Sequence, residues 1–348
     1  MTTRYEIVQE DLLSSQYTWL ITGVAGFIGS NLLERLLILN QKVIGLDNFD
    51  TGFQHNIDQA IEDASSETAT SIEEIKKNFN FIHGDIRLLK DCHKACKNVH
   101  FVLHQAALGS VPRSIEDPIN TNKANIDGFL NMLVASSEAK VKRFVYAASS
   151  STYGDHKELP KVEEVIGNPL SPYAVTKLVN ELYAGVFFKA YGLSSIGLRY
   201  FNIFGKRQDP NGAYAAVIPK WLNEIFNEKE ITINGDGTTS RDFCHISNAV
   251  QMNIIAATST DQLSENQIYN TALNENTSLN ELYRLIEDKI NKRKKLSTKV
   301  FPKYQPFRDG DVLHSQADIS KAKTLLGFAP SHNINQGLDE YIDWFLTI

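Results

Sequence analysis

Tyr173 and Lys177 stand four residues apart and can together supply a general base. The surrounding stretch keeps helical character as far as Phe188, and side chains at i and i+4 share one face of a helix. An ammonium group beside a phenol stabilises the phenolate, so we expect Lys177 to lower the pKa of Tyr173 from about 10 toward the working pH. Such pairs also occur by chance on solvated helices, so the assignment needs support from other residues.

A run of hydroxyl side chains, Ser149-Ser150-Ser151-Thr152, directly follows the apolar segment Phe144–Ala148. In a doubly wound sheet, the carboxyl ends of the strands face the ligand crevice. Ser149 is therefore placed to hydrogen-bond a reacting oxygen while Tyr173 moves the proton. The alternative is that these serines cap a helix. The pair formed by Tyr173 and Lys177 favours the catalytic interpretation.

A glycine-rich turn, Thr22-Gly23-Val24-Ala25-Gly26-Phe27-Ile28-Gly29, follows the apolar run Thr18–Ile21 and opens a leucine-rich helix. The glycines permit a tight turn and a close approach of the backbone to a pyrophosphate, while the helix N-terminus favours negative charge. This order of strand, turn and helix predicts a dinucleotide site. Asp47 ends the next apolar run, and a carboxylate there accepts the ribose hydroxyls and repels a 2′-phosphate, which favours NAD over NADP. A turn-forming Asp47-Asn48 pair is the alternative.

These residues need a sheet to position them, and the chain supplies the strands. Continuous apolar strands separated by helices indicate a parallel sheet covered on both faces. We therefore predict an α/β fold, a Rossmann-type doubly wound parallel sheet. After about Asn202 the pattern becomes irregular, with turn signals at 209–212 and 234–237, which predicts a smaller C-terminal substrate-binding lobe. The predicted strands are Thr18–Ile21, Lys42–Leu46, Phe79–Ile82, Phe101–His104, Phe144–Ala148 and Ser195–Leu198.

Composition excludes several classes of protein. With 348 residues, of which 42% are hydrophobic and 22% charged, the chain can bury a large core. A net charge of -6 gives no field that would hold a polyanion, so we expect no nucleic-acid partner. Segment 1–17 contains acidic residues and predicts a short amphipathic helix rather than a signal peptide. No apolar run reaches the roughly 18 residues of a membrane span, so we expect no membrane insertion and a cytoplasmic location.

The three cysteines, Cys92, Cys96 and Cys244, are few and odd in number, which fits a reducing compartment. Cys92 and Cys96 would share a helix face beside His93, an arrangement that half of a metal site also has. No second ligand pair follows at usable spacing, so we interpret them as buried thiols and assign no metal.

Several motifs occur along the chain in an order that resembles the extended short-chain dehydrogenases. Within that superfamily the chain is most similar to the UDP-hexose 4-epimerases, and the stretches 107–114, 205–214 and 314–318 resemble the branch acting on UDP-N-acetylglucosamine and UDP-N-acetylgalactosamine or their uronic acids. The motifs that carry the resemblance are Gly23-x-x-Gly26-x-x-Gly29, Asp47-Asn48, Gly84-Asp85-Ile86, His104-Gln105-Ala106-Ala107, Ser149 with Tyr153-Gly154, Tyr173-x-x-x-Lys177 and Arg199-Tyr200-Phe201-Asn202.

The resemblance implies a role for each matching position. Ser149, Tyr173 and Lys177 match the catalytic residues. The implied NAD-binding residues are Gly23, Gly26, Phe27, Ile28, Gly29, Asp47, Asn48, Thr51, Gly52, Asp85, Ile86, Gln105, Ala106, Ala107, Tyr173 and Lys177. The implied UDP-sugar-binding residues are Gly109, Ser110, Ser149, Ser150, Ser151, Asn202, Gln208, Arg241, Arg308, Asp311 and Ser315. Arginine suits such a site because its planar fork binds phosphate oxygens in pairs.

The same resemblance implies the domains and the reaction. Residues 1–201 and 244–272 would form the NAD-binding Rossmann domain, and 202–243 and 273–348 the UDP-sugar-binding domain of a homodimer. The reaction would be NAD-dependent C4 epimerisation of a UDP-N-acetylhexosamine through a 4-keto intermediate, in surface polysaccharide synthesis. Ser315 replaces a tyrosine found in epimerases restricted to UDP-glucose and UDP-galactose, which would leave room for a 2-acetamido group.

Three alternatives remain open. The first is 4-epimerisation of the corresponding uronic acid. The second is 4,6-dehydration or decarboxylation on the same scaffold, which we disfavour because no carboxylate follows Ser149 before Asp155 to act as the extra acid or base. The third is a non-catalytic NAD-binding redox sensor. The intact set of Ser149, Tyr173 and Lys177 argues against a sensor, which needs no base.

Overall fold

A seven-stranded parallel sheet forms the larger part of the computed structural model, which describes residues 2–212, 215–297, 300–307 and 313–347. The strand order is β11-β6-β5-β4-β1-β2-β3, which confirms the predicted Rossmann-type fold. Each of the six predicted strands lies within an observed one, and the seventh was not predicted. The strands are β1 (Thr18–Thr22), β2 (Lys42–Asp47), β3 (Phe79–His83), β4 (Phe101–His104), β5 (Arg143–Ser149), β6 (Ser195–Tyr200) and β11 (Gln267–Thr271).

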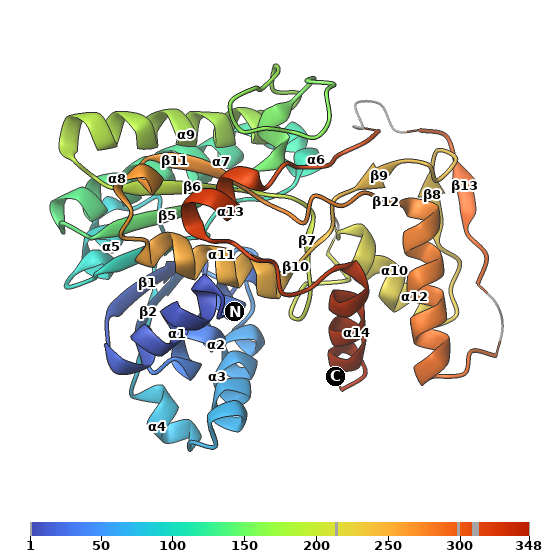
Figure 1. Ribbon diagram of the computed structural model, residues 1–348, viewed down its shortest axis with the longest axis horizontal. Coiled ribbons are helices and arrows are strands. Elements are labelled where there is room, and N and C mark those ends of the chain that lie inside the picture. The colour runs from blue at the N-terminus through green and yellow to red at the C-terminus, as the bar shows by residue number, and fades with distance from the viewer. Residues whose placement is uncertain (1, 213–214, 298–299, 308–312, 348) are drawn as a thin grey trace.

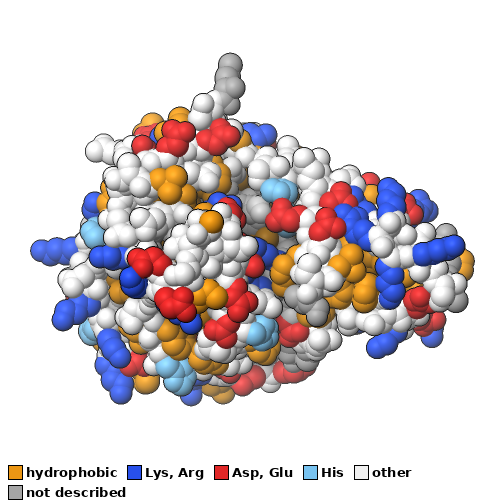
Figure 2. All heavy atoms as spheres, turned by 90° about the horizontal axis from the view of Figure 1, so that it is seen from below, with side chains coloured by type: hydrophobic (Ala, Val, Ile, Leu, Met, Phe, Trp, Pro, Cys, Tyr) orange, Lys and Arg blue, Asp and Glu red, His pale blue; other side chains and the backbone are white. Residues whose placement is uncertain are grey.

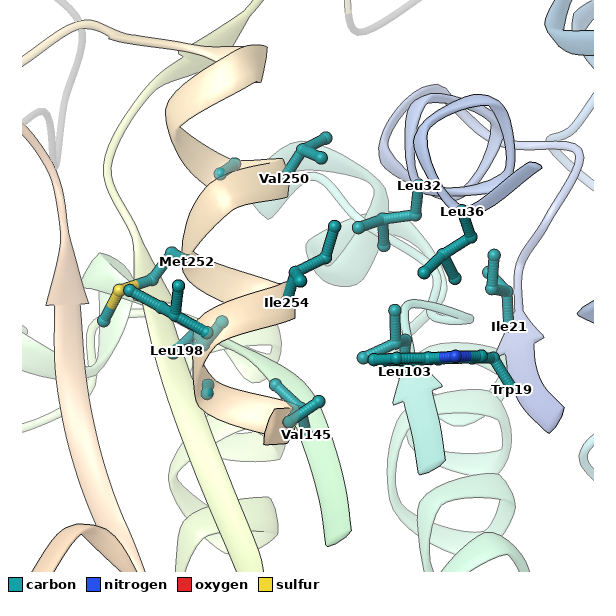
Figure 3. Close-up of a cluster of buried hydrophobic side chains, with 14 of the residues drawn as sticks. Trp19, Ile21, Leu32, Leu36, Leu103, Val145, Leu198, Val250, Met252 and Ile254 are labelled. Atoms are coloured by element: carbon teal, nitrogen blue, oxygen red, sulfur yellow. The ribbon is translucent and has the colours of Figure 1, made fainter. Parts of the chain in front are cut away.

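Helices cover both faces of this sheet (Figure 1). Hydrophobic clusters bury each face: Leu32 and Ile254 belong to one cluster, and Phe129 and Ala184 belong to the other. On the first face, side chains from α2 and α11 converge on the strands (Figure 3). The helices of that face are α1 (Arg4–Ser14), α2 (Phe27–Ile38), α3 (Gln54–Thr68) and α11 (Ile246–Thr258), and those of the other are α5 (Leu89–Cys96), α8 (Gly128–Glu138) and α9 (Pro172–Tyr191).

The order of the strands creates the crevice that holds the site. After β1 the chain adds β2 and β3 on one side, and then returns to place β4 on the other side of β1. Ligands of open α/β sheets bind outside the carboxyl ends of the strands at such a switch point. Short helical segments extend the wall after β4: α6 (Val111–Glu116), α7 (Pro118–Asn122) and a single π-helical turn at Lys123–Asp127.

A second lobe lies beside the sheet, as Figure 1 shows. It has its own hydrophobic cluster, with Trp221, Leu282 and Leu338 buried at its centre. Its elements are α10 (Val217–Phe226), α12 (Leu279–Arg293), α14 (Ile334–Phe345), the parallel pair β8 (Thr232–Asn234) and β13 (Lys303–Gln305), and the antiparallel pair β9 (Ser240–Arg241) and β12 (Thr277–Ser278).

The described chain passes between the lobes several times. The parallel pair β7 (Ile203–Phe204) and β10 (Cys244–His245) lies where the chain leaves and re-enters the sheet. Later, α13 (Ser320–Leu326) returns to pack its Ala322 and Leu326 on the cluster of the sheet. The domain boundaries stay a prediction, and this packing places part of segment 273–348 on the Rossmann core. Acidic and basic side chains are interspersed over the face drawn in Figure 2.

The remaining sequence interpretations concern the N-terminus and the cysteines. Helix α1 confirms the predicted amphipathic helix and packs through Val8 and Leu12. All three cysteines are buried as free thiols. Burial raises the pKa of Cys92 to about 12 and that of Cys96 to about 11, so neither offers a thiolate near neutral pH. Among the described helices, none combines the length and apolar character needed to span a bilayer.

Candidate active site

A groove runs along the carboxyl ends of β1, β2 and β4, and nearly every predicted NAD-binding residue lines it. Gly52 lies just behind the wall, where an added Cβ would meet Ala25 Cβ at 2.7 Å. Tyr173 and Lys177 line the adjoining cavity instead. The predicted residues in the groove are Gly23, Gly26, Phe27, Ile28, Gly29, Asp47, Asn48, Thr51, Asp85, Ile86, Gln105, Ala106 and Ala107.

The glycine turn fits a bound pyrophosphate. Gly23 has φ +70°, and a Cβ on Gly29 would lie 2.0 Å from the Gly23 carbonyl oxygen, so neither position tolerates a side chain. Gly26 is the N-cap of α2 and places no side chain over the first turn of the helix. The backbone N–H groups of that turn therefore remain open to an anion, as NAD binding requires.

Asp47 has two functions in the groove. Its carboxylate accepts hydrogen bonds from the backbone N–H of Ala25 at 2.9 Å and from that of Phe49 at 2.8 Å, and burial raises its pKa. The turn-forming interpretation is thus part of the structure, since the second bond closes a turn over Asn48. Each carboxylate oxygen has a further lone pair, so Asp47 can fix the glycine turn and keep the capacity to accept the ribose hydroxyls, as the sequence predicts.

Replacing Asp47 with Asn should shift cofactor preference. The amide keeps the shape of the side chain and removes the charge that repels a 2′-phosphate, so we expect the NAD-to-NADP affinity ratio to fall about tenfold. Titrating both cofactors into apo-protein measures the ratio. The same exchange at Asp50, which also lines the groove but ends no strand, is the control. An unchanged ratio in the Asp47 variant would remove this residue from cofactor discrimination.

Asp85 and two arginines extend the groove beyond Asp47. The Asp85 carboxylate accepts from Asn48 Nδ2 at 2.9 Å and from Arg87 Nε at 3.0 Å. Burial acts to raise its pKa, but the hydrogen bonds from Arg87 and Asn48 outweigh burial and leave the pKa below its usual range. Arg87 and Arg113 line the groove. The sequence did not predict their placement: Arg87 belongs to no motif, and Arg113, within the stretch 107–114, was given no role.

The predicted catalytic residues converge in a second cavity, which we call the catalytic cavity, that adjoins the groove. Ser149 ends β5, and Tyr173 and Lys177 lie on successive turns of α9, whose N-cap Ser171 accepts from the Ala174 N–H. Ser149 and Tyr173 hydrogen-bond through their side chains. The two spaces share a wall formed by Phe27, Ile28, Gln105, Ala107, Gly109 and Gln208. A sugar in the cavity would thus lie next to a cofactor in the groove.

The pKa of Tyr173 differs from our prediction. Burial raises it, and the hydrogen bond with Ser149 lowers it by less. Lys177 does not reverse the shift, because Nζ donates to the Ala147 carbonyl at 2.7 Å and lies 5.9 Å from the centre of the Tyr173 ring. Burial also lowers the pKa of Lys177 to about 8. The prediction of a lowered tyrosine pKa was wrong for this structure because spacing on a helix does not report burial.

The predicted sugar-binding residues divide into four sets. Arg308 and Asp311 lie outside the described residues. Ser151 turns its hydroxyl to Ser149 Oγ at 2.9 Å. Arg241 and Ser315 lie on adjacent segments, since Ser315 N donates to the Ser240 carbonyl at 3.1 Å, and among the described residues they line neither space. The structure brings together Gly109, Ser149, Ser150, Asn202 and Gln208 in the catalytic cavity, with Ser110 in the groove.

A polar network supports the wall between the two spaces, and sequence reasoning missed it. Gln105 Oε1 accepts from the Tyr200 hydroxyl at 3.0 Å, and Gln105 Nε2 donates to Asn253 Oδ1 at 3.0 Å. Asn253 Nδ2 completes the triangle by donating to the Tyr200 hydroxyl at 2.8 Å. The available signal was weak, because Asn253 is one of several polar residues among the apolar residues of helix α11.

One histidine cluster bears on the prediction of no metal. Among the described residues, His245, His332 and Glu340 place potential ligand atoms within 4.8 Å of one another. His332 Nε2 already lies 2.9 Å from a Glu340 oxygen as an ion pair, and burial followed by the charges of Glu340, His332 and Lys206 sets the pKa of His245 near 4. The ammonium group of Lys206 acts on His245 and would repel a metal cation bound there. We assign no metal to this cluster, and the absence of a metal stays a prediction.

Comparisons with known proteins agree with this geometry. The family model described as "NAD dependent epimerase/dehydratase family" matches residues 19–272. A UDP-glucuronate 4-epimerase of Thermodesulfobacterium geofontis is 33% identical over 94% of this chain and 95% of its own. The structure of a UDP-N-acetylglucosamine 4-epimerase from Methanobrevibacter ruminantium, in complex with UDP-N-acetylmuramic acid, has TM-score 0.85 and 34% identity over 96% of this chain and 99% of that chain. The structure of a UDP-glucuronic acid 4-epimerase from Bacillus cereus, in complex with UDP-glucuronic acid and NAD, has TM-score 0.82 and 29% identity over 95% of this chain and 99% of that chain.

Proposed function

The chain belongs to the NAD dependent epimerase/dehydratase family, and we propose that it is a UDP-sugar 4-epimerase acting on a UDP-N-acetylhexosamine, UDP-GlcNAc or UDP-GalNAc. One observation carries the proposal: Ser149 and Tyr173 lie together in the catalytic cavity, which shares a wall with the cofactor groove, and no carboxylate accompanies them on the Ser149–Thr152 segment. Asp155, the next acid along the chain, accepts from Asn168 N at 2.7 Å instead. The extra acid that dehydration needs is therefore turned toward another loop.

Each catalytic residue has a role that follows from its position. NAD held by the residues of the groove would supply the acceptor for the C4 hydride and the donor for its return. Tyr173 accepts the proton of the C4 hydroxyl, and Ser149 hydrogen-bonds the same oxygen. While Lys177 is protonated, its positive charge lies near the Tyr173 phenolate and stabilises it. UDP stays bound while the 4-keto hexose turns about its link to the diphosphate, so that the opposite face receives hydride and proton.

The N-acetyl specificity is supported by small residues and by one relative. A Cβ at Gly109 would meet no atom within 4 Å, so the shared wall leaves open space at that point. Ser315 is small at the position where the resemblance places a specificity residue. The M. ruminantium relative is a UDP-N-acetylglucosamine 4-epimerase. Relatives that act on UDP-glucuronate support the uronic acid as the second candidate.

A panel of UDP-sugars deuterated at C4 tests the function. We expect the purified protein to invert C4 of UDP-GlcNAc fastest and to retain the label in the product, because the hydride returns to the carbon that it left. UDP-glucose and UDP-N-acetylglucosaminuronate complete the panel. Faster inversion of the uronate would move the assignment to the second candidate. Binding of NAD without inversion of any sugar would favour the redox sensor, and solvent exchange at C4 would contradict internal hydride return.

We further propose that the protein is a cytoplasmic homodimer that supplies surface polysaccharide synthesis. The dimer is supported by an apolar face that follows α9 and continues on α6 and α7, where Ile119 is 68% exposed. Exposed apolar patches of this kind mark protein contacts. We infer that a second copy of the chain covers this face. Val175, Leu182 and Val186 are exposed along one side of α9, and such a face can pair with the same face of another copy about a twofold axis.

Replacing Leu182 with Asp should convert the dimer to a monomer. The charge would be buried in the contact, and an unpaired buried charge is strongly unfavourable. Light scattering during gel filtration at micromolar concentration should show the mass halved relative to the wild type. The same substitution at Leu263, which is 71% exposed away from α9, is the matched control. A dimer that persists in the Leu182 variant would exclude this face as the interface.

A further inference from the structure

A buried ion-pair network lies outside the catalytic residues described above. The Arg207 side chain is fully buried and pairs with Glu34, and also with Asp63 at 3.2 Å. The neighbouring Lys206 pairs with the same two acids, at 2.7 Å to Glu34 and 3.2 Å to Asp63. Burying the Arg207 guanidinium is costly unless it is paired, so its position depends closely on those of Glu34 and Asp63.

The network joins the loop after β7 to the helices of the cofactor groove. Glu34 belongs to α2, the helix that begins at the glycine turn, and Asp63 belongs to α3. Asn31, one turn before Glu34, adds two bonds: its Nδ2 donates to the Lys206 carbonyl at 3.1 Å, and its Oδ1 accepts from Arg207 Nη2 at 3.2 Å. The loop therefore has a fixed position relative to the cofactor cradle.

The loop is held in an uncommon backbone conformation. Arg207 has φ +66° and Asn202 has φ +34°, in the region that residues other than glycine rarely adopt. Such conformations persist where surrounding contacts determine them. The network supplies these contacts for Arg207, whose backbone sets the direction of the next side chain.

That next residue is Gln208, which lines both the cofactor groove and the catalytic cavity. Its Nε2 donates to the Ile203 carbonyl at 3.2 Å, which fixes the orientation of the amide. Its Oε1 is buried and accepts no hydrogen bond from any described residue. A buried acceptor without a donor is unfavourable, and a donor on the sugar would satisfy it.

We propose that Lys206 and Arg207 form a clasp with Glu34 and Asp63 that positions Gln208 against the sugar and the cofactor. The clasp residues are positioning residues. They line neither the cofactor groove nor the catalytic cavity, and they act only through Gln208. This inference rests on the proposed function, because the group that would donate a hydrogen bond to Gln208 Oε1 is a hydroxyl or amide of the substrate sugar.

A double-mutant cycle tests the clasp. Arg207→Lys keeps the charge but loses the planar fork that holds Glu34, Asp63 and Asn31 together. We expect kcat/KM for UDP-GlcNAc to fall about tenfold, mainly through kcat, because a displaced amide misaligns the sugar. NAD content and the affinity for UDP, which lacks the sugar, should stay unchanged. In a Gln208→Ala background, Arg207→Lys should cost nothing further, because coupled residues are not additive.

Arg293→Lys is the matched control, since Arg293 pairs with Asp339 and Asp343 on the second lobe, away from the site. Additive losses in the cycle, or a fall in UDP affinity equal to the fall in kcat/KM, would overturn the clasp and leave a structural ion pair. If Arg207→Lys fails to fold, Lys206→Met at the more exposed end takes its place in the cycle. If the wild type inverts no sugar, the proposed function fails, and the same cycle measured as UDP-GlcNAc affinity decides on the clasp alone.

Discussion

Replacing Tyr173 with Phe should lower kcat by roughly two to four orders of magnitude, the usual range of general acid–base catalysis. The substitution removes one hydroxyl, whose partner in the structure is Ser149. The ring stays in place, so packing around α9 should not change. We therefore expect the melting temperature and the NAD content to remain close to those of the wild type. Stopped-assay turnover of UDP-GlcNAc, together with cofactor content of the purified protein, measures both.

Tyr183→Phe provides the matched control, because Tyr183 lies on the same helix and loses the same hydroxyl outside the cavity. That variant should keep wild-type turnover. Wild-type turnover in the Tyr173 variant would remove this residue from the mechanism. A loss of NAD together with activity would assign Tyr173 to cofactor retention instead of proton transfer.

Six of the seven strands in the sheet could be predicted because each is a short, largely apolar run between helices. The edge strand β11 could not be predicted, because Gln267, Asn270 and Thr271 interrupt its apolar pattern. Its strand conformation is held by parallel pairing with β6. The strands of the second lobe are two or three residues long, too short for any periodicity to show. Only their turn signals were visible in the sequence.

The site divides in the same way between local and distant determinants. The glycine turn and Asp47 depend on neighbours in the chain, so their order in the sequence was sufficient to predict the groove. Asn253 and Arg207 act on partners more than 140 residues away, at separations of 148 and 173 residues, and no local motif marks them. The raised pKa of Tyr173 likewise results from burial by distant segments.

Substituting Tyr for Ser315 should reduce kcat/KM for UDP-GlcNAc by about one to two decades and spare UDP-glucose. Overpacking a fitted site commonly costs about 1 to 3 kcal/mol, which gives this range if the cost falls on the transition state. Ser315 is half-buried on the segment beside β9, next to Arg241, which the resemblance places on the UDP moiety. Ser315 lines neither the groove nor the catalytic cavity, so the resemblance alone places it beside the 2-acetamido group, whose volume a phenol ring there would occupy.

The measurement is the ratio of kcat/KM for UDP-GlcNAc to that for UDP-glucose in the Ser315→Tyr variant and in the wild type. Ser315→Ala is the control, because it keeps the side chain small and should leave the ratio unchanged. If Ser315 is only a small residue near a strand end, the tyrosine would slow both sugars equally. An unchanged ratio would then remove Ser315 as the specificity residue, and the N-acetyl assignment would rest on the open space at Gly109 and on the acceptor of Gln208.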